Sequence, residues 1–283
     1  MTARTTDVDI CSTGRGWRVP KSCYIAAMNS GFSDADRLKR SALAAVALRM
    51  GWWRGFKLAR GYWRTYIRKG YLPYEPSLWW EAYHSAADGS DASTIELSAD
   101  PLVSQYHYAT IETLILRVLH TYGMPQRVLD LGSGAGHWLN FYQRLGCEVT
   151  GVELSSEAAR RLRERFSQIE QCHIADMELS GFDLVNAIGV MFHIVDDDAH
   201  RRAISAIGQA IKPGGLLIVG GGFPLISVNV QFDEDSQVNK RLRSRRYWRQ
   251  ELESWMDVRF IRNRAAREIH AIVPESDLLI AIR

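Results

Sequence analysis

The sequence lacks the cysteine spacing of a disulfide framework or a zinc site. Its four cysteines are scattered over 283 residues without a Cys-x-x-Cys pair, so reduced thiols in a cytosolic protein are the better interpretation. The N-terminus lacks the apolar core of a signal peptide. The longest apolar run near it, residues 42–48, ends at Arg49, far short of the roughly 20 residues that a membrane span requires. We therefore expect a cytoplasmic location.

A large charge imbalance is also missing, because the formal net charge is only +3. That value does not by itself imply a nucleic-acid partner. The distribution of charge along the sequence is more informative, since residues 36–70 carry ten Lys or Arg residues and no acidic residue after Asp36. Aromatic side chains recur among them at helical spacing, which predicts one or two basic amphipathic helices. These helices could pack on the rest of the chain, lie on a membrane surface as a peripheral contact, or contact nucleic acid, which is the less favoured partner.

Before residue 127 the chain divides by composition. Residues 1–35 show neither strand nor helix periodicity and predict a poorly ordered leader. Residues 36–100 form a basic helical extension or lid, with a short helix starting near Trp79, and residues 101–283 form the main domain. Residues 105–122 predict a helix with one apolar face, ended by Gly123 and Pro125.

From residue 127 short apolar runs alternate with helical stretches. This alternation predicts parallel β-α-β units with helices on both faces, and hence a doubly wound, seven-stranded, mostly parallel α/β sheet. The expected strands are 127–131, 148–153, 171–175, 182–188, 216–220, 257–262 and 277–282. The expected helices are 137–144, 156–166 and 198–211. Between residue 222 and the last two strands we expect a loop and a basic helix at about 243–253.

The loop after the first strand is rich in glycine. The run Val-Leu-Asp-Leu-Gly-Ser-Gly-Ala-Gly, residues 128–136, passes directly into a helix that starts at His137. Ligands of open parallel sheets bind at such a point. A dinucleotide fold needs G-x-G-x-x-G, but the spacing here is G-x-G-x-G and His137 replaces the third glycine. Asp130 is also unsuited to a polyanion and suited to a cation, which disfavours a nicotinamide-dependent oxidoreductase.

This run resembles motif I of class I S-adenosylmethionine (SAM)-dependent methyltransferases. The rest of the family's layout follows in order, through the fourth strand and the turn Ile-Lys-Pro-Gly-Gly before the fifth. The resemblance covers residues 110–222 well and 240–283 loosely. It implies SAM as the cofactor, with Glu153 holding the ribose and Asp176 the adenine amino group. The full set of implied cofactor-binding residues is Asp130, Gly132, Ser133, Gly134, Gly136, Glu153, Asp176 and Met177, the serine and methionine by adjacency.

The acceptor side is less clearly marked. His193, just past the fourth strand, is the candidate general base, although it could equally brace the loop. Asp196–Asp198 invite a metal, but capping of the following helix is the better explanation, so no metal site is predicted. The basic run at 240–249 could bind an anionic group of the acceptor or form a solvated helix face. Gly220–Gly222 could make room for a bulky acceptor, and Tyr106–Tyr108 could cover the site.

The sequence thus predicts methyl transfer from SAM to a small molecule, with oxygen or nitrogen as the accepting atom. Residues 186–189, Asn-Ala-Ile-Gly, lack the Asn/Asp-Pro-Pro-aromatic signature of enzymes that methylate flipped bases. RNA modification through other motifs stays open as the alternative enzyme. A SAM-binding module without catalysis, docked through the basic N-terminal helices, is the alternative from another class.

Overall fold

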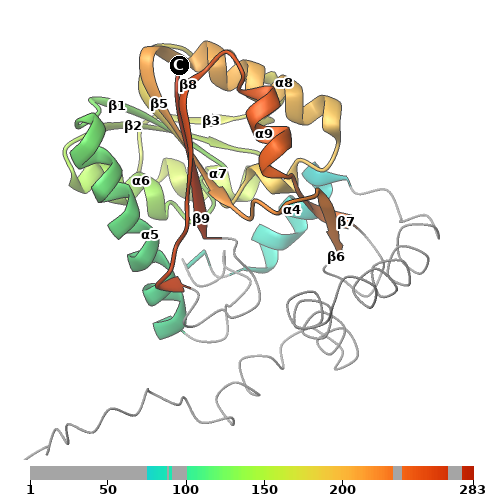
Figure 1. Cartoon of the computed structure of the whole chain (residues 1–283). Coiled ribbons are helices and arrows are strands. Elements are labelled where there is room, and N and C mark those ends of the chain that lie inside the picture. Colours follow the sequence, from blue (N-terminus) through green and yellow to red (C-terminus); the bar gives the residue numbers. More distant parts are fainter. Residues whose placement is uncertain (1–74, 88, 91–100, 232–237, 267–275) are drawn as a thin grey trace, which may run out of the picture.

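The computed structural model describes residues 75–87, 89–90, 101–231, 238–266 and 276–283 (Figure 1). Within these ranges a seven-stranded sheet has the order β3-β2-β1-β4-β5-β9-β8. Only β9 runs antiparallel to its neighbours, so the predicted mostly parallel, doubly wound fold is confirmed. The strands are β1 (Arg127–Leu131), β2 (Glu148–Glu153), β3 (Ile169–Gln171), β4 (Phe182–Ile188), β5 (Ile211–Gly221), β8 (Met256–Ile261) and β9 (Asp277–Ile282).

Alternate residues of the central strands pack against different helix layers, as the period of two in a strand requires. Leu129 and Leu217 belong to the core under α8 (Asp197–Ala210) and α9 (Arg245–Glu251). Their neighbours Val128 and Leu216 belong to the core under α5 (Pro101–Tyr122) and α6 (His137–Arg144). Because both faces are covered, the strands are almost continuously apolar. The carboxyl edge of the sheet is where polar side chains collect.

The helix starts are set by short polar side chains. Ser155 caps α7 (Ser156–Arg163) by accepting a hydrogen bond from the amide of Ala158 at 3.2 Å. Asp196 caps α8 through the amide of Ala199 at 2.7 Å, so the capping explanation for Asp196–Asp198 is confirmed. Such caps satisfy amide groups that the first helical turn leaves unpaired.

Two local predictions were wrong. The third strand, expected at 171–175, is the three-residue edge strand β3, and Ile174–Asp176 form the short 3₁₀ helix η3 instead. The region after residue 222 is more than a loop, because β6 (Val228–Gln231) and β7 (Val238–Leu242) form a separate antiparallel hairpin. The helix α9 begins only at Arg245.

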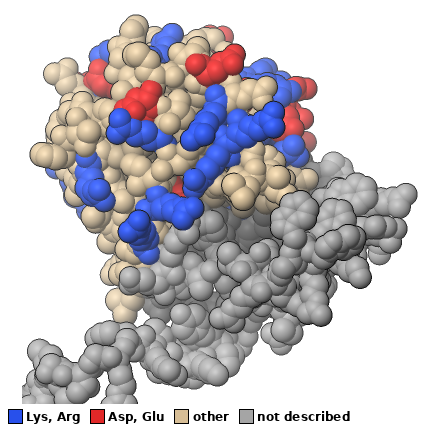
Figure 2. All heavy atoms as spheres, viewed as in Figure 1, with Lys and Arg blue, Asp and Glu red and all other residues tan. Residues whose placement is uncertain are grey.

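Lys and Arg side chains gather on the face of the molecule shown in Figure 2.

The predicted leader (residues 1–35) and the basic segment (residues 36–70) lie outside the described residues. The described part of the extension is α4 (Pro76–Ala86), which contains the short helix expected near Trp79. The helix predicted at 105–122 is α5, which begins four residues earlier at Pro101. Proline suits that position because the first helical residue needs no amide donor.

Candidate functional site

The glycine loop joins β1 to α6 where the strand order reverses, between β1 and β4. Gly132, Gly134 and Gly136 all have positive φ angles, of 67°, 51° and 85°, a conformation in which a Cβ is strained. A Cβ on Gly132 would also lie 2.5 Å from Cγ2 of Val190, just after β4. The backbone of the loop therefore approaches the end of β4 more closely than a larger residue would permit.

Asp130 lies on β1 below this loop, and the residue is 1% exposed. Its Oδ1 accepts a hydrogen bond from Nδ2 of Asn186 on β4 at 2.7 Å, whereas its Oδ2 has no partner among the described residues. Burial raises the pKa of Asp130 to about 7, although the hydrogen bond from Asn186 opposes the change. The buried Ser133 hydroxyl donates to the carbonyl of Asp130 at 3.1 Å. An unpaired buried carboxylate oxygen is costly and is satisfied by a cation or a donor.

Glu153 ends β2, next to the loop, and is 5% exposed. Its Oε1 accepts from the amides of Leu154 and Ser155 at 2.8 and 2.9 Å, and its Oε2 accepts from the amide of Gly134 at 2.8 Å. An ionised carboxylate offers about four lone-pair positions, so one position on Oε2 stays available. Glu153 thus links the end of β2 to the glycine loop and can still accept one hydrogen bond.

Asp176 and Met177 follow β3, and their side chains differ in exposure. Asp176 is exposed at the end of η3, whereas Met177 is 5% exposed and its side chain packs in the core under α8. His173 caps η3 by accepting from the amide of Ala175 at 3.0 Å. The carboxylate of Asp176 is therefore open to a ligand, and the thioether of Met177 faces the protein interior.

The helix α4 crosses the carboxyl edge of the sheet from the end of β2 to the end of β4. Glu81 accepts hydrogen bonds from the hydroxyl of Ser155 and the amide of Ser156, at 2.8 and 2.7 Å, at the N-terminus of α7. His84 is 6% exposed and interacts electrostatically with Glu153, and burial is the main reason that its pKa is lowered. These residues were missed from the sequence, because no motif connects them to residues about 70 positions later.

His193 ends the 3₁₀ helix η4 (Met191–His193) just after β4. The ring of Trp80 on α4 packs edge-on against its imidazole, with the ring centres 4.7 Å apart. The ring of Phe192 lies 4.6 Å away. The structure therefore places His193 at the same edge as the glycine loop, under α4. Of the aromatic residues proposed as a lid, Tyr108 stacks on His137 at 3.7 Å, and Tyr106 reaches the carbonyl of Ala265 at 3.4 Å.

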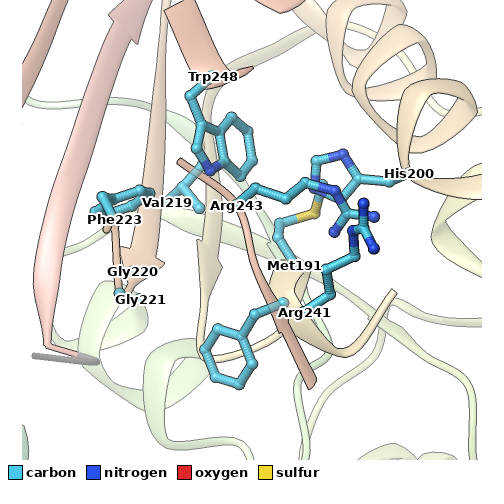
Figure 3. Close-up of a pocket in the computed structure, with 11 residues that line it drawn as sticks. Met191, His200, Val219, Gly220, Gly221, Phe223, Arg241, Arg243 and Trp248 are labelled. Carbon is cyan, nitrogen blue, oxygen red and sulfur yellow. The ribbon is translucent and has the colours of Figure 1, made fainter. Parts of the chain in front are cut away.

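A pocket lies beyond the carboxyl ends of β4 and β5, and we call it the β5 pocket (Figure 3). At the end of β5, the wall of the pocket is formed by Gly220–Gly222. A Cβ on Gly221 would lie 3.1 Å from Cδ1 of Phe192. Its other lining residues include Phe192, His200, Phe223, Arg241 and Trp248. The glycines that the sequence singled out thus border a cavity.

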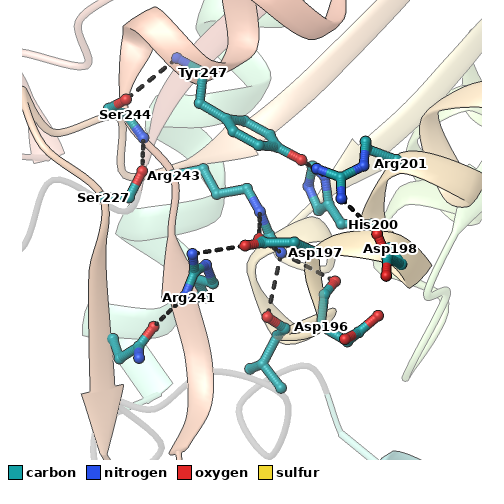
Figure 4. A network of polar contacts seen from close by, with 12 residues as sticks. Asp196, Asp197, Asp198, His200, Arg201, Ser227, Arg241, Arg243, Ser244 and Tyr247 are labelled. Carbon is teal, nitrogen blue, oxygen red and sulfur yellow. Dashed lines mark hydrogen bonds and ion pairs between the residues drawn. The ribbon is translucent and has the colours of Figure 1, made fainter. Parts of the chain in front are cut away.

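The basic run at 240–249 is divided between several environments. Arg243, with a side chain only 1% exposed, binds Oδ1 of Asp197 at 2.9 Å and the carbonyl of Ile194 at 2.9 Å (Figure 4). Arg241 binds Oδ2 of the same aspartate at 2.8 Å. Arg249 instead lies over the ring of Phe260. The run is thus not one solvated helix face, and two of its guanidinium groups border the β5 pocket.

Within the described residues no three His, Cys, Asp or Glu side chains are grouped closely enough to hold a metal ion. In the same part of the chain, no helix combines the length and apolar character needed to cross a membrane.

Comparisons with known proteins agree with this geometry. Residues 128–215 match the family model described as "Methyltransferase domain". The ubiquinone biosynthesis O-methyltransferase of Idiomarina loihiensis is 33% identical over 106 residues, which is 34% of this chain and 42% of that protein. The enzyme of the same name from Alkalilimnicola ehrlichii is 30% identical over 102 residues, 33% of this chain and 40% of that protein. The chain therefore spans less than half the length of these relatives.

The crystal structure of the N-methyltransferase NodS from Bradyrhizobium japonicum, in complex with S-adenosylhomocysteine, has the same fold. The TM-score is 0.51 with 17% identity, over 74% of this chain and 97% of that chain. The likeness at this identity concerns the fold alone. The residues that match the family model include the glycine loop, Glu153 and Asp176.

Proposed function

We propose that this chain transfers a methyl group from SAM to a small molecule, because residues 128–215 match the model of a methyltransferase domain and the seven-stranded sheet carries the glycine loop where the strand order reverses. The accepting atom is oxygen or nitrogen. One observation carries the proposal above the others. The buried Oδ2 of Asp130 has no partner among the described residues, and it lies beneath a glycine loop that brings the backbone close to a ligand. A cofactor with cationic groups and no phosphate suits that combination.

The residues present fit the cofactor. Asp130 would offer its unpaired oxygen to the cationic end, and Gly132, Ser133, Gly134 and Gly136 would provide the close backbone surface. Glu153 can accept one ribose hydroxyl without rearrangement. A second ribose hydrogen bond to Glu153 would require the amide of Gly134 to release Oε2, so the loop would adjust on binding. Asp176 is exposed and available to the adenine amino group, and Met177 would contribute through its backbone.

The chemistry depends on alignment more than on acid or base groups. SAM supplies an electrophilic methyl group on a sulfonium centre. The chain must hold the acceptor in line and exclude water. We assign water exclusion to α4, because Trp80 and His84 cover the edge between β4 and β2. His193 lies at the same edge, where it would accept a proton if the acceptor is a hydroxyl or a protonated amine.

Isothermal titration with S-adenosylhomocysteine tests the cofactor assignment. Micromolar binding is expected for the wild-type protein, with a large loss in the pair Asp130→Asn and Glu153→Gln, which preserves side-chain shape. The matched control is Glu170→Gln, at an exposed position on β3. Binding of NAD(H) in place of S-adenosylhomocysteine, or no binding by a folded protein, would overturn the proposal.

Turnover of labelled SAM with a panel of acceptors separates the enzyme from its alternatives. A small-molecule product excludes the non-catalytic SAM-binding module, and methylated RNA would favour the RNA-modifying enzyme. The surroundings of Asn186 argue against methylation of a flipped base, which the Asn/Asp-Pro-Pro-aromatic signature at this strand end would indicate. Its amide is buried between Asp130 and the hydroxyl of Tyr142, at 2.7 and 3.2 Å, so its side chain is committed inside the fold.

The remaining parts of the proposal concern layout and location. Residues 101–283 would be the methyltransferase domain, residues 36–100 its lid and docking extension, and residues 1–35 a leader. The chain would be cytoplasmic, with residues 36–70 providing a peripheral contact to an anionic membrane surface. Co-sedimentation with anionic lipid vesicles tests this contact, and unchanged binding after deletion of residues 36–70 would rule it out.

A further inference from the structure

Two residues that line the β5 pocket, His200 and Arg241, each have a buried polar atom without a partner among the described residues. His200 is fully buried, and its Nδ1 lies 3.2 Å from the hydroxyl of Tyr247 while its Nε2 has no partner. Arg241 uses its terminal nitrogens on Asp197 and Asn229, at 2.8 and 3.2 Å, and its Nε has no partner. Buried groups of this kind are normally paired, so two of them at one pocket point to a ligand that pairs with them.

The charged residues around the pocket indicate the sign of the ligand's charge. Arg241 and Arg243 both line it, no Asp or Glu among the described residues does, and both guanidinium groups bind the same carboxylate, that of Asp197. Burial, with help from these arginines, lowers the pKa of His200 to about 2. The imidazole is therefore neutral. One carboxylate facing two guanidinium groups leaves an excess positive charge, which favours an anion and disfavours an ammonium group.

The walls of the pocket select the shape of the ligand. Phe192, Phe223 and Trp248 line it with flat apolar surfaces, and the glycines of β5 contribute no side chains. The interior is narrow, with room for about one water-sized group. A single oxygen atom fits in this space, and a ring attached to it would pack against the aromatic side chains that line the pocket.

We propose that the β5 pocket binds the methyl acceptor, and that the acceptor is a planar aromatic molecule carrying an anionic oxygen, as a phenolate or a carboxylate. The oxygen accepts hydrogen bonds from Nε–H of Arg241 and from His200. An anion selects the histidine tautomer with the proton on Nε2, in which Tyr247 donates to Nδ1. This inference rests on the proposed methyltransferase function and gives its acceptor a chemical class.

Ligand-observed NMR in the presence of saturating S-adenosylhomocysteine tests the proposal. The probes are 4-nitrophenolate at pH 8.5, benzoate and benzylammonium. We expect at least one of the two oxyanions to bind and benzylammonium not to bind, and the stronger oxyanion then identifies phenolate or carboxylate. Equal or stronger binding of benzylammonium, or no binding of any probe at millimolar concentration, would refute the proposal.

Two variants locate the binding. Arg241→Lys keeps the positive charge but removes Nε–H, and we expect at least a roughly tenfold loss of oxyanion affinity. Gly221→Ala adds a Cβ 3.1 Å from the Phe192 ring and should narrow the pocket, with a similar loss of oxyanion affinity. Arg246→Lys, exposed on α9, is the matched control. Unchanged oxyanion affinity in both test variants would overturn the inference. The affinity for S-adenosylhomocysteine, measured separately, shows whether the cofactor assignment has failed instead.

Discussion

The carboxyl group of Asp130 should link cofactor binding to pH. Burial raises its pKa to about 7 in the ligand-free protein, against an ordinary value of 3.8. A cationic group placed at the unpaired Oδ2 would favour the ionised form and lower the pKa again. Below pH 7, S-adenosylhomocysteine should therefore release a proton when it binds through its ammonium group. Affinity should rise with pH and level off above about pH 7.

The size of the effect follows from the two pKa values. If binding restores the ordinary value, the ionised fraction of free Asp130 limits affinity, and it rises from roughly 3% at pH 5.5 to roughly 90% at pH 8. The expected gain in affinity is about 30-fold, or about 2 kcal/mol. At pH 5.5 nearly one proton should be released per ligand bound.

Isothermal titration in two buffers with different ionisation enthalpies measures both quantities. The perturbation is Asp130→Asn, which keeps an oxygen that can accept from Asn186 and removes the titrating group. In this variant the proton release attributed to Asp130 should disappear and the affinity should vary little between pH 5.5 and 8. A wild-type affinity that is flat over this range, or an equal pH dependence in both proteins, would refute the reasoning.

Three further predictions concern the loop, α4 and the candidate base. Gly132→Ala should abolish binding of S-adenosylhomocysteine in titration, because its Cβ would clash at 2.5 Å, whereas Gly146→Ala has the same sign of φ and no neighbour within 4 Å and should bind normally. Glu81→Gln weakens the contact to the N-terminus of α7 and should speed ligand release about fivefold in stopped-flow fluorescence, with Glu75→Gln unchanged as control. His193→Gln should lower turnover without changing the affinity for S-adenosylhomocysteine. Full turnover would leave this histidine only a structural role.

Most of the sheet could be predicted because each central strand is a buried apolar run bounded by turn residues. The predicted bounds of β1, β2, β4 and β9 agree with the structure. The edge strand β3 was misplaced, because only Ile169 among its residues is buried and the apolar signal is correspondingly weak. The hairpin was missed for a different reason. Lys240 on β7 is 6% exposed, and its ammonium group lies over the ring of Phe192. A charged residue at a buried position interrupts the apolar pattern by which a strand is recognised in the sequence.

The position of Asp130 and Glu153 beside the glycine loop could be predicted from the sequence, and the arrangement of side chains around the β5 pocket could not. Asp130 and Glu153 end neighbouring strands, and the topology of a parallel sheet brings such ends together. Glu81 and His84 reach the same edge only through the packing of α4. The partners of Arg241 and His200 likewise come from separate elements of the tertiary structure. Residue spacing within a motif is local information, and these contacts are not local.

The two halves carry opposite charge, and this arrangement has a chemical consequence. The carboxylates of Asp130 and Glu153 lie beside the glycine loop, and the guanidinium groups of Arg241 and Arg243 line the β5 pocket. Under the proposed function, a cationic methyl donor would be attracted to one part of the edge and an anionic acceptor to the other. Each charged site repels the wrong reactant, which favours a single relative orientation.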